Sequence, residues 1–321
     1  MHPARVRPLG EMDFSRIDWR ILGCSAAIPA PGHYPSAQSL RVGGTLMLLD
    51  CGEGTQIRIR EVGLRGATFD VILISHLHGD HVFGLPGLLS SWTLQGRTKP
   101  LTLVGPRGLE AFLCGINAAS QGSWSYPVAF RVAEPGVVFE NEDVRIAAHP
   151  LVHRIEAWGY RVGEVVAPRR VRYEAAVAAG LEHADFRSLQ LGRDAVTRGG
   201  IPVRNAEVTD PGRPGFQMAY LSDTSYAPAL ADFAQGVSFL YHESTYLDRH
   251  AALAQKTGHS TARQAGQIAQ AAGANCLVLG HFSQRYAQLA DFATEAKEAY
   301  SGPVLVGRSG MNPVAERSNQ P

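Results

Sequence analysis

The stretch Ile74–His81, "ISHLHGDH", places three histidines and an aspartate in one short turn directly after an apolar run. The preceding residues, "DVILIS", are apolar enough to form a buried strand, so the turn lies at the carboxyl end of that strand. In open α/β sheets ligands bind at this edge. Gly79 removes a side chain where the backbone must turn tightly. Neutral imidazoles and a carboxylate in this arrangement predict a metal site, suited to zinc and also to manganese or iron.

The four polar groups of the turn form two neighbouring sets, His76 with His78 and Asp80 with His81, which favours two metal ions. A solvated polar loop is the simpler alternative, but such a loop rarely carries three histidines. Two ions need ligands from elsewhere, and several strand-like runs end in suitable residues. These are His149 and His153 after "VRIAA", Asp223 after "QMAYLS" and His281 after "CLVLG".

Around this motif, short apolar runs alternate with helical patterns, which predicts an α/β fold of sheets flanked by helices. Strands are predicted at "WRILGCSAAIP", "TLMLLDCGEG", "DVILISH", "LTLVGP", "VRIAAHP", "QMAYLSD", "VSFLYHES", "CLVLGHFS" and "PVLVG", and helices at "FGLPGLLSSWTLQ", "GLEAFLCGINAAS", "STARQAGQIAQAAG" and "LADFATEAKEAY". The segment from about 168 to 214 is rich in arginine, glycine and proline, which predicts a weakly structured insertion. The last residues, about 312–321, are predicted to be a frayed tail.

The composition excludes several classes of protein. Of the 321 residues 45% are hydrophobic and 18% charged, and the formal net charge is +1, so a polyanionic partner must be attracted by a local patch or a metal. The N-terminus lacks the apolar core of a signal peptide, and no apolar run approaches the roughly 18 residues of a membrane span. No GxSxG elbow or GxxxxGK[ST] loop occurs. The four cysteines form no CxxC pair, and the sequence predicts a cytoplasmic protein without a membrane partner.

A set of motifs in this order resembles the ribonuclease Z family, tRNA 3′-processing endonucleases of the metallo-β-lactamase superfamily. The motifs are "LDCGEGTQ", "SHLHGDH", "HRIEAWGYR", "SDTS", "HEST", "GHST" and "GHFSQRY", and the resemblance runs from about Leu22 to Leu305. HxHxDH alone identifies the superfamily, whereas "HFSQRY" with "HEST" and "GHST" is more specific. "LGCSAAIP", "YHESTYL" and "KTGHSTARQA" are similar to the branch found in Bacteroidetes-type bacteria.

The resemblance implies a single domain over residues 1–321, a four-layer αββα sandwich with a short inserted arm at about 168–214. It also implies two zinc ions per chain, precursor tRNA as the substrate and a homodimer. The ligands carried over by motif are His76, His78 and His153 for one zinc, and Asp80, His81 and His281 for the other, with Asp223 bridging. His153 is preferred to His149 because "HRIEAWGYR" matches the family there. Asp50 either orients a ligand imidazole or is a turn residue.

Several residues next to these ligands are predicted to take part in hydrolysis. Asp80 can steer the attacking water and accept its proton. Thr261–Gln264 form a capping box that opens a helix, so His259 lies just before a helix N-terminus, where it can protonate the leaving oxygen or stabilise phosphoryl charge. The resemblance agrees that His259 is catalytic. Glu243 can fix the tautomer of His259 or make a core hydrogen bond, and Arg285 can hold a phosphate or form an ordinary salt bridge.

The insertion, "APRRVRYEAAVAAGLEHADFRSLQLGRDAVTRGG", occupies the place of the family's tRNA-binding arm but lacks the Gly-Pro tip. Arg169, Arg170 and Arg172 are predicted to contact the tRNA backbone; alternatively they pair with Glu174 and Asp185, or tRNA is held elsewhere, for example by the dimer partner.

Two other functions compete with tRNA processing. One is a metal-dependent phosphodiesterase for small or cyclic phosphodiesters on the same fold, and the other is an RNA-binding homologue without metals.

Overall fold

The computed structural model of the chain describes residues 14–165, 169–190, 192–210 and 215–318. Contacts divide the chain into two compact units. The larger unit comprises residues 1–164 and 216–321, and the inserted unit comprises residues 165–215. The N-terminal segment for which no signal peptide is predicted lies outside the described residues.

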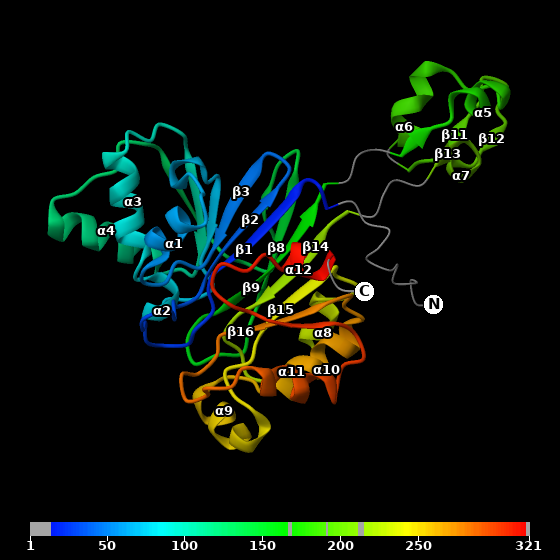
Figure 1. Ribbon diagram of the computed structural model, residues 1–321. Coiled ribbons are helices and arrows are strands. Elements are labelled where there is room, and N and C mark those ends of the chain that lie inside the picture. Colours follow the sequence, from blue (N-terminus) through cyan, green and yellow to red (C-terminus); the bar gives the residue numbers. More distant parts are fainter. Residues whose placement is uncertain (1–13, 166–168, 191, 211–214, 319–321) are drawn as a thin grey trace. The chain divides into compact units, whose positions relative to one another are not determined.

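Within its described residues, the larger unit contains two sheets packed face to face (Figure 1). The first sheet has the order β1-β2-β3-β4-β5-β6, with antiparallel pairing from β1 to β3 and parallel pairing from β3 to β6. Its strands are β1 (Ile17–Gly23), β2 (Ala37–Val42), β3 (Thr45–Leu49), β4 (Val71–Leu73), β5 (Leu101–Gly105) and β6 (Val128–Val132).

The second sheet has the order β17-β16-β15-β14-β9-β8-β7. Pairing is parallel from β14 to β17 and antiparallel from β7 through β9 to β14. Its strands are β7 (Gly136–Glu140), β8 (Val144–Pro150), β9 (Trp158–Glu164), β14 (Gln217–Leu221), β15 (Phe239–Glu243), β16 (Leu277–Gly280) and β17 (Val304–Val306).

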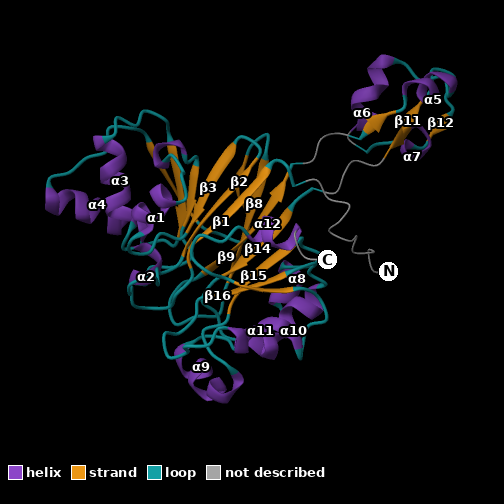
Figure 2. Cartoon of the chain, viewed as in Figure 1, coloured by secondary structure: helices purple, strands orange, loops and turns teal. Residues whose placement is uncertain are grey.

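Helices cover the outer face of each sheet, which confirms the predicted αββα layering (Figure 2). The first sheet carries α1 (Thr55–Glu61), α3 (Leu85–Leu94) and α4 (Leu109–Ser120), and the second carries α8 (Leu230–Phe233), α10 (Ala262–Ala272) and α11 (Ala290–Lys297). The short elements η2 (Gly66–Thr68), α2 (Gly79–Val82), η4 (Asp248–His250) and α9 (Ala251–Thr257) lie in the connections. In the described ranges, no helix is long and apolar enough to cross a membrane.

Side-chain alternation along the strands explains the two cores. Met47 of β3 points between the sheets and belongs to one buried cluster with Tyr160 and Met218 of the second sheet. Its neighbour Leu48 points the other way and packs with Trp92 of α3. Strands β14, β15 and β16 are buried on both faces, and such strands have nearly continuous apolar sequences.

Loops at the carboxyl ends of these strands carry the polar motifs. The loop after β4 contains His76–His81, and the loops after β14 and β16 begin with Ser222 and His281. Helix α10 begins at the predicted capping box, in which the Thr261 hydroxyl accepts from the Gln264 N–H and the Gln264 side chain accepts from the Thr261 N–H. The fold therefore gathers the motifs at one edge of the layers.

The inserted unit corrects the prediction of a weakly structured arm at about 168–214. It consists of β10 (Arg170–Val171), α5 (Tyr173–Ala178), η3 (His183–Asp185), α6 (Phe186–Gln190), β11 (Ala195–Val196), β12 (Pro202–Val203), α7 (Asn205–Val208) and β13 (Thr209–Asp210). Strand β10 pairs with β13 and β11 with β12. A small core of its own holds these pieces together: Ala176, Leu181, Leu189, Ala195, Val203 and Val208. Elements this short give almost no periodic signal in a sequence.

The predicted frayed tail at about 312–321 is also wrong over most of its length. Helix α12 spans Pro313–Ser318, with Val314 buried. The Asn312 side chain accepts from the Ala315 N–H and donates to Asp18. An asparagine cap followed by proline at the first helical position is a strong start signal for a helix, and it overrides the tendency of termini to fray. Residues 319–321 lie outside the described residues.

Candidate metal centre

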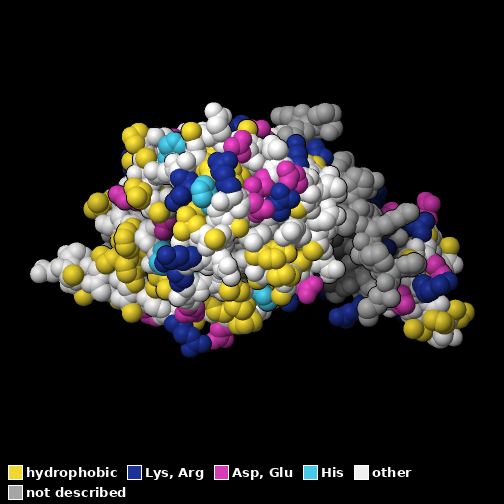
Figure 3. Space-filling view, turned by 90° about the horizontal axis from the view of Figure 1, so that it is seen from below, with side chains coloured by type: hydrophobic (Ala, Val, Ile, Leu, Met, Phe, Trp, Pro, Cys, Tyr) yellow, Lys and Arg dark blue, Asp and Glu magenta, His cyan; other side chains and the backbone are white. Residues whose placement is uncertain are grey.

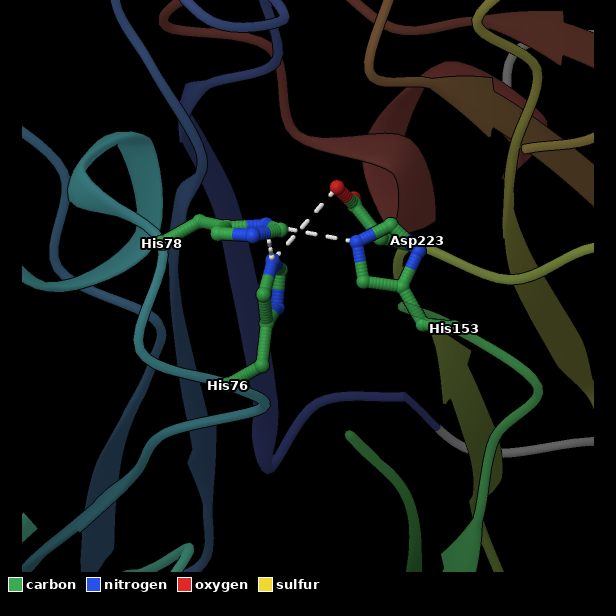
Figure 4. A group of neighbouring side chains, drawn as sticks. All are labelled: His76, His78, His153 and Asp223. Atoms are coloured by element: carbon green, nitrogen blue, oxygen red, sulfur yellow. Dashed lines mark hydrogen bonds and ion pairs between the residues drawn. The ribbon is translucent and has the colours of Figure 1, made fainter. Parts of the chain in front are cut away.

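Three histidine side chains and one carboxylate converge at the first half of the site (Figure 4). Nδ1 of His78 lies 2.9 Å from Nε2 of His76 and 3.2 Å from Nε2 of His153. Oδ2 of Asp223 lies 3.5 Å from Nε2 of His76. The ring nitrogens of these three histidines therefore point toward one another, although His153 is 75 residues away from His78 in sequence.

The second half of the site has two histidines and Asp80 around the other oxygen of Asp223. Nε2 of His281 lies 3.3 Å from Nε2 of His81 and 3.3 Å from Oδ2 of Asp80. Oδ1 of Asp223 lies 3.3 Å from Nε2 of His81 and 3.2 Å from Nε2 of His281. The two oxygens of Asp223 thus face different halves of the cluster.

Hydrogen bonds on the outer side of the rings determine which nitrogen faces inward. Nδ1 of His81 lies 2.8 Å from the Asp50 carboxylate, and Nδ1 of His153 lies 2.8 Å from the Gly258 carbonyl. Because both partners can only accept, each Nδ1 is the donor. In the neutral ring Nε2 is then unprotonated, and its lone pair is directed into the cluster.

The same logic holds for two further rings. Thr245 donates to Glu243 over 2.8 Å, so its hydroxyl accepts from Nδ1 of His281, which lies 2.8 Å away. Ser75 donates to Asp50 over 2.9 Å and accepts from Nδ1 of His76 at 3.0 Å. Outer partners of this kind orient metal-binding imidazoles in many proteins.

Asp50 is the centre of this outer network. It is fully buried and accepts from the Ser75 N–H at 2.7 Å, the Tyr220 hydroxyl at 2.7 Å and His81. Its φ of 56° lies in the left-handed region, as does that of His281 at 58°. Non-glycine residues in this region are uncommon and concentrate at functional sites. The structure therefore supports the interpretation of Asp50 as an orienting residue over that of a turn residue.

The charges in the cluster favour a bound cation. Burial lowers the pKa of His76, His78 and His153, which keeps these rings neutral and able to ligate. Burial opposes the charging of His81, but the carboxylate of Asp223 outweighs it and raises the pKa of His81 well above its usual range. Inward lone pairs and carboxylate oxygens this close repel one another unless positive charge lies between them. This donor set therefore fits a metal ion.

His259 lies beside the cluster but differs from the other rings. Its Nδ1 lies 3.0 Å from Oε1 of Glu243 and 3.9 Å from Oδ2 of Asp223. Burial lowers the pKa of His259, but the charge of Glu243 and the hydrogen bond between them outweigh burial and raise it to about 9. Glu243 is fully buried and also accepts from the Ser260 N–H at 3.0 Å. The predicted pair of His259 and Glu243 is therefore in direct contact.

A cavity of about 540 Å³ opens onto this cluster. His78, Asp80 and His259 line it, together with the predicted residue Arg285. The Arg285 guanidinium is exposed and lies 5.5 Å from the centre of a neighbouring tyrosine ring. Sequence reasoning missed other lining residues, among them Arg154 and Phe83. Arg154 directly follows His153, and Phe83 lies two residues after His81; this closeness to the ligand motifs is the signal that could have identified them.

One candidate ligand, His149, lies outside the cluster. His149 stacks on Phe233 at 4.9 Å, so the structure brings His153 rather than His149 to the metal centre. The three arginines of the arm belong to the inserted unit. There Arg169 donates to Thr209 at 2.8 Å and Arg172 donates to the Glu207 carbonyl at 2.6 Å. Arg172 also lies 3.6 Å from a carboxylate oxygen of Asp210 instead of pairing with Glu174 or Asp185.

Comparison with known proteins adds independent information. The chain is 42% identical over 291 residues to ribonuclease Z from Salinibacter ruber, covering 89% of this chain and 90% of that protein. It is 38% identical over 294 residues to ribonuclease Z from Porphyromonas gingivalis, covering 91% of this chain and 96% of that protein. Residues 17–114 match the family model described as anti-Pycsar protein Apyc1. That match covers less than half of the chain, whereas the two relatives match nearly all of it.

Solved structures agree with the layering. The short form of human tRNase Z is 26% identical, with a TM-score of 0.66 over 92% of this chain and 97% of that chain. The metallo-β-lactamase fold protein YhfI from Bacillus subtilis is 19% identical, with a TM-score of 0.66 over 92% and 98%. The second likeness concerns the fold alone, and it confirms the predicted metallo-β-lactamase fold.

Proposed function

The chain belongs to the ribonuclease Z family, and from this premise we propose that it removes the 3′ trailer of precursor tRNA with the help of two zinc ions. As a member of this family it is a metal-dependent endoribonuclease. The observation that carries the proposal is that the two oxygens of Asp223 face two neighbouring groups of histidines, Oδ2 toward His76 and Oδ1 toward His81 and His281. Shared carboxylates are typical of sites in which two ions lie a few ångströms apart.

The assignment of ligands follows the two halves of the cluster. One zinc would be held by His76, His78 and His153 and the other by Asp80, His81 and His281, and Asp223 would contribute to both. Five imidazole ligands favour zinc over magnesium or calcium, which prefer oxygen ligands. The outer hydrogen bonds to Asp50, Ser75, Thr245 and Gly258 support this assignment, because they hold the inward nitrogens in place.

Such a centre, when loaded, activates water near neutral pH and neutralises the charge of a phosphodiester. The chain's own residues orient the attack. The Ala27 N–H donates to Oδ2 of Asp80 at 2.7 Å and fixes that carboxylate at the cavity wall. Asp80 is placed to accept the proton of the attacking water, while Arg285, which lines the same cavity, holds the phosphate.

The leaving oxygen needs a proton, which we assign to His259. The Glu243 carboxylate engages Nδ1 of His259 at 3.0 Å, so Nε2 is the atom left for the substrate. Glu243 itself is held by the Thr224, Thr245 and Ser260 N–H groups at 3.2, 2.8 and 3.0 Å. This anchoring supports a role for Glu243 in positioning the general acid.

The inserted unit is proposed to grip tRNA through Arg169, Arg170 and Arg172. Arg169 and Arg172 each use part of their guanidinium within the unit, and each guanidinium has five N–H donors, so donors remain for phosphate. The family resemblance also supports a homodimer and a cytoplasmic location as parts of the proposal.

Replacing Arg169, Arg170 and Arg172 by glutamine is expected to weaken precursor tRNA binding and its salt dependence. Each lost phosphate contact reduces the slope of log affinity against log salt by roughly 0.7–0.9. The matched control replaces Arg187, Arg193 and Arg198 of the same unit, which removes the same charge from other positions. Filter binding across a salt series measures both variants. An unchanged slope in the first variant, or equal changes in both, would contradict the proposed grip.

The rival function is hydrolysis of small or cyclic phosphodiesters on the same fold. If the enzyme processes tRNA, kcat/KM for precursor tRNA should exceed that for bis-p-nitrophenyl phosphate by on the order of 10² or more, because binding energy from the remote parts of tRNA lowers the barrier. Parallel assays with precursor tRNA, the chromogenic ester and a cyclic mononucleotide measure this ratio. A preference for either small substrate would favour the rival.

A further inference from the structure

The ring of Phe83 lines the catalytic cavity but has no part in the chemistry described above. Phenylalanine is usually buried, yet this side chain is 61% exposed. Phe83 follows α2, and its N–H donates to the Gly79 carbonyl at 2.9 Å. It lies three residues after Asp80, a spacing that brings side chains to the same side of a helical turn. An exposed aromatic ring is therefore next to a residue of the metal centre.

Contacts on two sides hold the ring in place despite its exposure. It stacks on Phe112 of α4, with ring centres 6.3 Å apart and planes inclined by 19°. It also covers Gly79, where an added methyl group would lie 2.4 Å from a carbon of the ring. A ring fixed in this way loses little conformational entropy when a ligand stacks on it.

The lining of the cavity combines apolar and charged side chains. Ala26, Ile28 and Pro29 line it together with Phe83, and Asp80, Arg154, His259 and Arg285 supply charged and polar groups. On the face that carries α2 and α9, hydrophobic, basic and histidine side chains lie beside one another (Figure 3). A nucleotide likewise combines a flat base with an anionic phosphate.

We propose that Phe83 is a stacking platform for the unpaired base next to the scissile phosphate. This inference rests on the proposed function and names the chemistry of its substrate: a single-stranded nucleotide whose base leaves the stack of the acceptor stem. Every base has a π-face, so the contact tolerates different sequences. A subunit interface would also explain an exposed ring, but the position of Phe83 inside the catalytic cavity favours the nucleotide.

The test is a double-mutant cycle between the ring and the base. Precursor tRNAs carry an abasic nucleotide on the 5′ side or on the 3′ side of the scissile phosphate. We expect loss of the stacked base to lower kcat/KM of the parent about tenfold, and Phe83→Ala to do the same with intact tRNA. When the abasic nucleotide is at the stacked position, combining it with Phe83→Ala should lower kcat/KM about tenfold in total. Two independent changes would lower kcat/KM roughly a hundredfold.

Controls separate stacking from other effects. Phe83→Trp should retain the coupling, whereas Phe83→Leu should lose it because leucine is apolar without a π-face. Leu94→Ala, which removes an 85% exposed side chain of α3, should change neither kcat/KM nor the coupling. Metal content and thermal unfolding confirm that each variant is folded.

Three outcomes overturn the proposal. The first is that the losses in kcat/KM from Phe83→Ala and from the abasic nucleotide multiply at both flanking positions, which means that the ring and the base act independently. The second is a change of assembly state in Phe83→Ala, measured by sedimentation, which assigns the ring to a subunit interface. The third is a parent enzyme that does not cleave precursor tRNA; this alone refutes the proposed function and the inference with it.

Discussion

Asp223→Ala is expected to lose both metal ions, with bound zinc falling from about two per chain to well below one and tRNA cleavage falling to background. The reason is the position of the carboxylate. Oδ2 lies 3.5 Å from Nε2 of His76 in one half of the site, and Oδ1 lies 3.2 Å from Nε2 of His281 in the other. Removing it takes away a carboxylate that faces both halves. Elemental analysis of the dialysed protein measures the result.

His149→Ala is the matched control for this measurement. Like Asp223, His149 lies near the end of a strand, but it stacks on Phe233 outside the cluster, so this variant should keep both ions. Retention of two ions in Asp223→Ala would rule out the bridging role. Loss of a single ion would mean that Asp223 is a ligand of only one of the two proposed metal ions.

His259→Ala should keep its metals and lose about 10²–10⁴-fold in turnover of precursor tRNA, the usual contribution of a general acid. Its Nδ1 is engaged by Glu243 at 3.0 Å, and His259 is outside the proposed ligand set, so the substitution leaves the proposed ligands in place. Turnover under saturating substrate and metal content of the same preparation test both parts of this expectation.

The leaving group provides the control for His259. A nitrophenolate needs little protonation, so the defect of His259→Ala should shrink on bis-p-nitrophenyl phosphate. Near-normal cleavage of precursor tRNA would remove His259 from the mechanism. An equal loss on both substrates would point to a disturbed site rather than a missing acid.

The parts of the fold that were predictable have strong local patterns. Strands β4, β14, β15 and β16 are buried on both faces and therefore appear as continuous apolar runs. The sequence pattern does not reveal strand β2, because its buried residues include Gln38 and Ser39, and the Gln38 side-chain oxygen accepts from the distant Trp19 indole N–H at 2.8 Å. The inserted unit was misjudged because its strands are only two residues long.

In the candidate site, too, some residues are predictable from local sequence patterns and others are not. The histidines and aspartates were visible because four of them share one short motif and the others follow apolar runs. Their outer partners were not visible, since a serine or threonine acquires its role only through neighbours in space. Tyr220, for example, reaches Asp50 across 170 residues of sequence. Nothing in the local pattern around Tyr220 predicts this contact.

The central claim is endonucleolytic removal of the tRNA trailer, and mapping the fragments of a 3′-labelled precursor tests it most directly. The parent enzyme should release the whole labelled trailer as one fragment. The reaction should stop with a chelator and be absent in Asp223→Ala. Release of the label as a mononucleotide from the 3′ end, or intact precursor tRNA in a preparation that hydrolyses a small cyclic phosphodiester, would contradict the account.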